Sequence, residues 1–343
     1  MPVLPRALAL LGVLVVAVGL AACGGDDEAG TTPTPTEDAF LAGVVSDVGR
    51  FNDKGFNQLA LEGCQRAESE LGVQCRGLES RSTSDYVPNF ARLIRDGAGL
   101  SIATGFLLAE ATSTAADRFP DAQFAIVDYS AAAEPFAGSQ ENVLGLTFRT
   151  NENSYLIGCL AAQMAEREGE NTISAVGGIK IPTVDIFIAA YRAGAQRCVP
   201  GTRTLIAYSQ DFVDQAKCKE LALNQIGRGS KVVFQVAGGC GLGALDAARE
   251  RDVWGIGVDT DQSFLGPHIL TSAVKRVDVA VFEAIQTAVE GSFTGGRDLV
   301  FDLENGGVAV GEISSEVPEE FIERMNELEP MIRSGEIEPP TTV

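Results

Sequence analysis

The sequence predicts an α/β fold with two lobes, each a parallel sheet flanked by helices. Short apolar runs alternate with amphipathic segments from residue 40 onward, and the same alternation returns in a second half. A chain of 343 residues also exceeds what one compact core of ordinary size usually holds. Strand–helix alternation of this kind is typical of parallel sheets whose crossover helices cover both faces.

The first half supplies the clearest periodicity. Apolar or small residues recur every three or four positions between Leu59 and Leu71, as on one face of a helix, whereas residues 40–45 form a short apolar run typical of a buried strand. In chain order we expect strand 40–45, helix 57–71, strand 73–78, helix 87–95, strand 100–104, helix 107–118 and strand 123–128.

The second half repeats the pattern without recognisable sequence identity to the first. We expect helix 155–167, strand 172–177, helix 184–196, strand 204–208, helix 215–226, strand 231–236, helix 243–250 and strand 253–258.

The N-terminus has the features of an export signal. Arg6 is the sole charge in residues 1–22, and an apolar run follows it up to Ala22. Leu20-Ala21-Ala22-Cys23 resembles the bacterial lipobox, which implies that 1–22 is a signal peptide and that Cys23 carries a lipid on the extracytoplasmic face of the cell membrane. The alternative is a plain membrane anchor with a chance cysteine, for which this run is slightly short.

The segment from 23 to 39 predicts a flexible tether between the lipid and a body that starts near Phe40. It is dominated by Gly, Pro, Thr and acidic residues and shows no apolar periodicity, so it cannot bury enough surface to offset its ordering entropy.

The charge excludes several classes of partner. The 47 acidic residues against 26 basic ones make nucleic acid a poor partner, because phosphate binding needs clustered Lys and Arg. An acidic surface also repels anionic lipids, so attachment to the membrane must come from the lipid anchor.

The residues do not point to a metal, a cofactor or a catalytic site. Beyond Cys23 the chain has six cysteines without a CxxC pair, and His268 is its one histidine, so a zinc site is not expected and disulfides are favoured in an exported protein. A Ser-His-Asp triad would have to use His268, and there is no GxSxG motif. The glycines of 238–243 lie between a strand and a helix but lack the Lys-Ser/Thr pair of a P-loop, so close backbone approach at a cleft edge is favoured. A glycosidase-like carboxylate pair among Asp47, Asp128 and Asp259 stays open.

The ends of the expected strands carry polar and aromatic residues, and ligands of open parallel sheets bind outside these carboxyl ends. Carboxylates, amides, glycines and aromatic rings gather there, which is the composition of a cleft for a polar small molecule. The residues concerned are Ser46, Asp47, Asn52, Asp53, Phe56, Gly105, Phe106, Asp128, Gly177, Gly178, Asp211, Phe212, Ala237, Gly238, Gly239 and Asp259.

The segment from Asp47 to Gln58, DVGRFNDKGFNQ, closely resembles the opening signature of the basic membrane protein (BMP) family of lipoproteins. This family includes nucleoside-binding components of ABC transporters. Further matches follow in family order over about residues 40–310, namely 85–86, 104–106, 124–128, 142–143, 177–178, 237–239, 257–262 and 271–276. The resemblance implies a type I periplasmic-binding-protein fold with three crossing strands between the lobes. It assigns 40–146 plus 275–306 to the N-terminal lobe and 147–274 plus 307–343 to the C-terminal lobe, which would close on a ligand by a hinge motion.

The resemblance also implies the ligand contacts. Phe56 and Phe212 would stack on a purine from opposite lobes, and Asp128 with Asp47 or Asn52 would bind base edges. Asp259 would accept from the ribose hydroxyls, and Lys275 would donate to a ribose oxygen and offset the charge of Asp259. The full set is Asp47, Asn52, Phe56, Asn57, Asp128, Phe212, Gly238, Asp259 and Lys275.

Two departures from the family pattern put the base preference in doubt. The family commonly has Ser where this chain has Gly55, and the segment 210–212 is more acidic than usual. The family also often has small residues where Cys218 and Cys240 stand. We expect disulfides Cys64–Cys75, Cys159–Cys198 and Cys218–Cys240, although six cysteines allow other pairings.

The resemblance therefore implies a solute-binding protein, not an enzyme, that captures a purine nucleoside and delivers it to an ABC permease. Its expected partners are the small molecule, the permease and the membrane through Cys23, with no cofactor and no nucleic acid. Open alternatives are the same fold binding a sugar or another metabolite, a surface signalling receptor, and a nucleoside hydrolase. A transcriptional regulator is disfavoured because no helix-turn-helix precedes residue 40.

Overall fold

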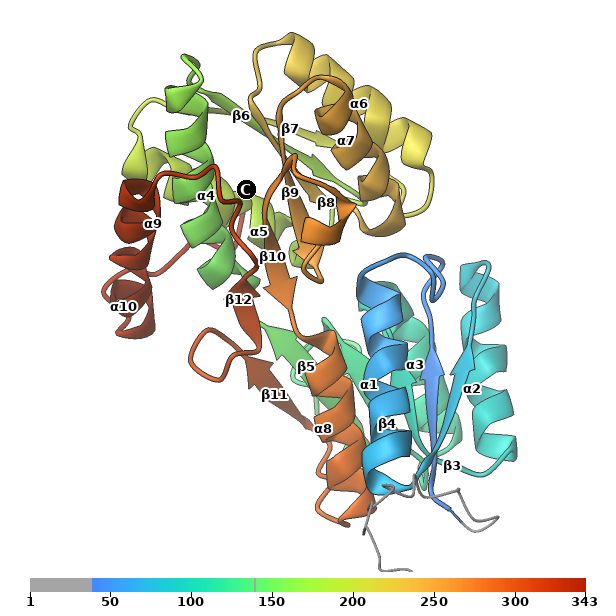
Figure 1. Ribbon diagram of the computed structural model, residues 1–343. Coiled ribbons are helices and arrows are strands. Elements are labelled where there is room, and N and C mark those ends of the chain that lie inside the picture. Colours follow the sequence, from blue (N-terminus) through green and yellow to red (C-terminus); the bar gives the residue numbers. More distant parts are fainter. Residues whose placement is uncertain (1–38, 139) are drawn as a thin grey trace, which may run out of the picture. The chain divides into compact units, whose positions relative to one another are not determined.

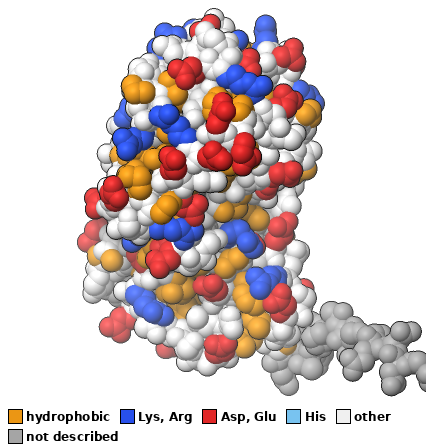
Figure 2. Space-filling view, turned by 60° about the vertical axis from the view of Figure 1, so that its left-hand side comes forward, with side chains coloured by type: hydrophobic (Ala, Val, Ile, Leu, Met, Phe, Trp, Pro, Cys, Tyr) orange, Lys and Arg blue, Asp and Glu red, His pale blue; other side chains and the backbone are white. Residues whose placement is uncertain are grey.

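The computed structural model describes residues 39–138 and 140–343 (Figure 1). The expected signal peptide, Cys23 and the tether up to residue 38 lie outside the described residues. Within the described part of the chain, no helix is both long and apolar enough to cross a membrane. On the face shown in Figure 2, acidic and basic side chains are interspersed with apolar ones.

The first lobe is built on a six-stranded sheet in which all neighbouring strands are parallel. Its order is β11-β5-β4-β3-β1-β2. Alternate strand residues face two separate apolar clusters, one under α1 and α8 and the other under α2 and α3. The elements are β1 (Leu41–Val45), α1 (Phe56–Leu71), β2 (Gln74–Leu78), α2 (Tyr86–Arg95), β3 (Ala98–Ala103), α3 (Ala109–Arg118), β4 (Gln123–Val127), β5 (Val143–Phe148), α8 (Val277–Val289) and β11 (Arg297–Phe301), with 3-10 turns η1 (Thr83–Asp85) and η2 (Phe106–Leu108).

The second lobe repeats this strand order in the sheet β12-β10-β9-β8-β6-β7, where only β12 runs antiparallel to its neighbour. Helices α4 and α5 pack together, as do α6 and α7 (Figure 1). The elements are α4 (Thr150–Arg167), β6 (Thr172–Gly177), α5 (Pro182–Cys198), β7 (Arg203–Tyr208), α6 (Gln215–Gly227), β8 (Val232–Val236), α7 (Gly238–Glu250), β9 (Trp254–Asp259), η3 (Ser263–Leu265), β10 (Ile269–Lys275), β12 (Val308–Val310), α9 (Glu319–Asn326) and α10 (Leu328–Arg333).

The predicted fold class is confirmed: both lobes are parallel-dominated sheets flanked by helices. The chain passes between the lobes three times, from β5 to α4, from β10 to α8 and from β11 to β12. The Asn153 amide in α4 donates to Val274 O and Ala309 O, both at 2.9 Å, and so ties this helix to two of the crossing segments. Phe148 at the end of β5 and Phe301 at the end of β11 stack on each other where two of the three crossings leave the first sheet. The lobe boundaries given above stay a prediction.

The helix expected at 243–250 was wrong at its start, since α7 begins at Gly238. Glycine lowers helix propensity, and the sequence places four glycines in this first stretch. Close packing explains two of them. A Cβ at Gly241 would overlap the Gln235 side chain, and one at Gly243 would overlap Gln215 O at the start of α6. The glycines therefore permit contact instead of ending the helix.

Candidate functional site

A cavity lies at the carboxyl ends of the strands of both lobes. Its empty space, counted with the open mouth, is about 590 Å³. All but one of the predicted ligand residues line it: Asp47, Phe56, Asn57, Asp128, Phe212, Gly238, Asp259 and Lys275.

Asn52 is the exception, and the structure places Asp53 in the cavity wall instead. Asn52 is exposed, whereas Asp53 is buried. The backbone explains the exchange, because Arg50 and Lys54 on either side adopt positive φ values of 62° and 54°. The tight turn between them directs Asn52 to solvent and Asp53 towards the start of α1.

Asp53 is committed to holding the N-terminus of α1. Its carboxylate accepts from the backbone amides of Gly55 at 3.1 Å, Asn57 at 2.9 Å and Gln58 at 3.2 Å, and from Asn57 Nδ2 at 2.9 Å. Burial raises the pKa of Asp53, and these hydrogen bonds oppose the rise. Since both oxygens are occupied, Asp53 positions the first turn of α1 and leaves ligand contact to its neighbours.

Asn57 joins Asp53 to Asp47. Its Nδ2 donates to Asp47 Oδ1 at 2.8 Å as well as to Asp53, and its Oδ1 accepts from Asp47 N at 3.0 Å. Both amide hydrogens of Asn57 are thereby used, so this side chain holds Asp47 in place. Its own contact with a ligand stays a prediction.

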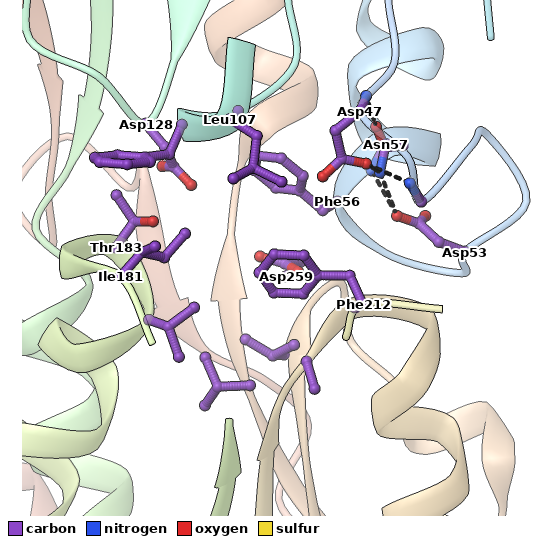
Figure 3. A pocket seen from close by; sticks show the side chains of 18 of the residues that line it. Asp47, Asp53, Phe56, Asn57, Leu107, Asp128, Ile181, Thr183, Phe212 and Asp259 are labelled. Carbon is purple, nitrogen blue, oxygen red and sulfur yellow. Dashed lines mark hydrogen bonds between the residues drawn. The ribbon is translucent and has the colours of Figure 1, made fainter. Parts of the chain in front are cut away.

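Asp47 presents a free oxygen to the cavity (Figure 3). Oδ1 accepts from Gly49 N at 2.6 Å and from Asn57, whereas Oδ2 has no hydrogen-bonding partner among the described residues. Burial raises the pKa of Asp47 to about 6 despite these bonds. Near neutral pH the group is mainly an ionised acceptor.

Asp259 ends β9 with a φ of 66°, a left-handed conformation that Asp tolerates better than most residues. Its side chain is buried and accepts no hydrogen bond from the described part of the chain. Burial raises its pKa to about 7, and the positive charge of Lys275 partly opposes the rise. A buried carboxylate without donors is costly, so this position is suited to a ligand that donates.

Lys275 forms its ion pair with Asp128, while its positive charge still lowers the pKa of Asp259 as expected. Its Nζ lies 2.5 Å from Asp128 Oδ2, and the two side chains are only 3% and 11% exposed. Asp128 follows β4 with a φ of 63°, so its carboxylate turns towards the end of β10 in the other sheet. The ammonium also lies 4.6 Å from the ring centroid of Phe56.

Two aromatic rings enter the cavity from opposite lobes (Figure 3). Phe56 is the first residue of α1, and Phe212 lies between β7 and α6. A glycine stands behind each ring: a Cβ at Gly105 would come within 2.9 Å of Phe56, and one at Gly178 would overlap Phe212. These glycines leave room for both rings beside the cavity.

An apolar wall completes the site and was not predicted. Ile181, Val184 and Phe187 line it from the start of α5, together with Thr183 and with Leu107 of η2. The spacing of three residues places the α5 side chains on one helix face. That spacing is visible in the sequence, but the expected helix began only at 184.

The structure joins the three expected cysteine pairs. Disulfides connect Cys64 with Cys75, Cys159 with Cys198, and Cys218 with Cys240. In the described part of the chain no cluster of His, Cys, Asp and Glu side chains could hold a metal ion. His268 does not line the cavity, so the triad alternative places its base away from this site.

Residues 40–342 match the Bmp family, described as PnrA-like ABC transporter substrate-binding proteins. The nucleoside-binding ABC transporter protein BmpA of Lactococcus lactis is 34% identical over 89% of this chain and 91% of its own. An uncharacterized lipoprotein of Pyrococcus abyssi is 32% identical over 88% and 75%.

Among solved structures, an ABC transporter solute-binding protein of Aeropyrum pernix superimposes with a TM-score of 0.79 at 26% identity, covering 88% of this chain and 94% of its own. The family match spans nearly the whole described body, and the fold agrees with that of this solute-binding protein. The chain therefore belongs to the Bmp family of ABC transporter substrate-binding proteins.

Proposed function

We propose that this protein is a lipid-anchored, extracytoplasmic receptor that captures a purine nucleoside and delivers it to an ABC permease. One observation carries the ligand assignment. Two phenylalanine rings face the cavity from opposite lobes, next to the buried carboxylates of Asp47 and Asp259, which have oxygens free to accept hydrogen bonds.

The rings suit a flat heterocycle. A purine between Phe56 and Phe212 would stack on both, and stacking is worth about 1–3 kcal/mol per base where it has been measured with nucleic acids. Asp47 Oδ2 faces the same space and, being largely ionised at neutral pH, would accept from a ring N–H or an amino group of the base.

The carboxylate of Asp259 suits the sugar. Its two oxygens can accept from both hydroxyls of a ribose, which would supply the hydrogen bonds that the described chain does not. Lys275 keeps two of its three donor hydrogens after pairing with Asp128 and can bind a sugar oxygen.

The anchored location rests on the sequence and the relatives. Residues 20–23 resemble a lipobox, and the Pyrococcus abyssi relative is named a lipoprotein. The Lactococcus lactis relative is named nucleoside-binding, which supports the ligand class. A receptor tethered beside its permease would raise the local concentration of loaded protein at the membrane.

The test is binding by the full-length chain in a mild detergent. Guanosine, inosine or adenosine should raise the unfolding temperature and give a calorimetric Kd, since ligand at a hundredfold excess over Kd stabilises by about 2.7 kcal/mol. Free ribose and arabinose are the comparison ligands. Phe212→Ala should weaken binding, while Phe264→Ala is the matched control, because Phe264 is 61% exposed and does not line the cavity.

Three results would contradict the proposal. Stabilisation by a sugar but by none of the nucleosides would indicate a sugar receptor of the same fold. Release of free base during long incubation, detected by chromatography, would indicate a hydrolase. A nucleoside Kd unchanged by Phe212→Ala would remove the stacking role.

A further inference from the structure

The segment that carries Phe212 lies at the rim of the second lobe. Residues 209–214 connect β7 to α6, and Val213 in this segment is 51% exposed. A ring that stacks on a ligand must nevertheless be held in place before binding, because ordering it on binding reduces affinity. The contacts that hold this segment therefore matter for the site.

The segment folds around Cys240. The backbone N–H of Cys240 donates to Phe212 O at 2.9 Å. Its Sγ lies 2.9 Å from Asp214 O and 3.5 Å from Ser209 Oγ, so the sulfur touches both ends of the segment. Cys240 is fully buried in the first turn of α7, next to Gly238 in the cavity wall.

Cys240 is fixed in turn by its disulfide with Cys218. Cys218 is also fully buried and lies in the first turn of α6, four residues after Asp214. These contacts form a closed loop. It runs from Phe212 along the chain to Cys218 in α6, through the disulfide to Cys240 in α7, and back through the hydrogen bond to Phe212 O. The loop therefore links α6 and α7 to the residue that carries the stacking side chain.

The other contacts of the segment are more local. Asp211 accepts from Val213 N at 2.8 Å and Asp214 N at 3.0 Å, and it pairs with Lys217 at 2.7 Å. Ser209 N donates to Gly177 O at 2.9 Å at the end of the sheet. These contacts shape the turn, whereas the Cys240 contacts place it against α7.

We propose that Cys218 and Cys240 are positioning residues of the ligand site, whose disulfide holds Phe212 ready to stack. The inference rests on the proposed function and goes one step further: the affinity for a nucleoside depends on the Cys218–Cys240 disulfide. The pair acts through Phe212 and does not touch the ligand, as neither cysteine lines the cavity.

The experiment compares two double variants of the full-length chain. Cys218→Ala/Cys240→Ala removes the proposed device. Cys159→Ala/Cys198→Ala is the matched control, since that disulfide also joins two helices of the second lobe. Cys198 lies about 16 Å along α5 from the cavity residue Phe187, at about 1.5 Å per residue. Both variants should unfold at lower temperature, so thermal stability alone does not separate them.

Inosine affinity, measured by calorimetry well below both unfolding temperatures, separates them. We expect the Kd to rise about five- to thirtyfold in Cys218→Ala/Cys240→Ala and less than about twofold in the control, within the range that one stacked base supplies. Cys218→Ser breaks the disulfide but keeps Cys240 in place, and it should also raise the Kd for inosine. This single variant replaces the double variant if the double variant does not fold.

A double-mutant cycle with Phe212→Ala tests the route of the effect. If the disulfide acts through Phe212, removing it from Phe212→Ala should cause little further loss of affinity. Additive losses, equal losses in the Cys159/Cys198 control, or free thiols at Cys218 and Cys240 in the native protein would overturn the inference while leaving nucleoside binding intact. Failure of the wild-type chain to bind any nucleoside would overturn both the inference and the proposed function.

Discussion

Binding should be coupled to proton release from Asp259. In the ligand-free site burial raises the pKa of this carboxyl to about 7. A ribose diol donates hydrogen bonds to the ionised form, so the bound state should have a lower pKa than the free state. The sign follows directly: affinity rises with pH through the free-state pKa and becomes level above it.

The magnitude follows from the same pKa. With a value of about 7, roughly one molecule in eleven is ionised at pH 6 and ten in eleven at pH 8, so the Kd should be about tenfold weaker at pH 6. At pH 7 each binding event should release about half a proton. Asp47, with a pKa of about 6, is about half ionised at pH 6 and adds at most about a twofold effect in the same direction if it accepts from the base.

Calorimetry at pH 6, 7 and 8, repeated in two buffers of different ionisation enthalpy, measures both the Kd and the protons released. The ligand should be adenosine, which does not titrate in this range. Asp259→Asn is nearly isosteric and should bind more weakly with most of the pH dependence gone. An affinity that is equal or higher at pH 6, or a slope that survives in Asp259→Asn, would refute the reasoning.

Three further predictions concern the same cavity. A Cβ at residue 55 would lie 3.6 Å from Asp259 Oδ2, so the hydroxyl of Gly55→Ser should donate to that carboxylate and lower its pKa in the free protein. The difference in Kd between pH 6 and pH 8 should then shrink, whereas Gly55→Ala, which adds no donor, should keep it. Lys275→Met leaves Asp128 unpaired and should lower the free energy of unfolding, measured in urea, by about 3–5 kcal/mol. Lys275→Met/Asp128→Asn should lose clearly less stability, and equal losses in the two variants would contradict a buried ion pair. Inosine 5′-monophosphate should bind at least about a hundredfold more weakly than inosine, because like charges brought together cost several kcal/mol and Lys275 is the one cationic side chain that lines the cavity in the described residues. Comparable calorimetric affinities would show that the carboxylates do not set this selectivity.

Much of the fold could be predicted because buried parallel strands have to be apolar. The runs at β1, β4 and β6 are buried on both faces, so composition alone distinguishes them from the amphipathic helices. The start of α7 could not be predicted in this way. Its glycines argue against a helix locally, and only the close approach of Gln215 and Gln235 shows why they are there.

The site residues likewise fall into those that the sequence predicted and those that it did not. Asp47, Asp128 and Asp259 were predicted from their place after strands, since the topology of a parallel sheet brings those ends together. The sequence placed both Asn52 and Asp53 near the cleft but could not predict which of them lines the cavity, because that depends on the sign of φ at the residues on either side.

The sequence by itself determined the order of strands and helices up to residue 258, apart from β5, and which strand ends carry carboxylates, because both follow from local periodicity. It did not predict the strands and helices after residue 258. It also carries the lipobox-like segment that ends at Cys23. Only the tertiary structure decided what each carboxylate does. Lys275 meets Asp128 across 147 residues of chain and leaves Asp259 without a donor. Hydrogen bonding and pKa depend on separations of a few ångströms between residues far apart in the chain, and local sequence patterns do not specify those separations.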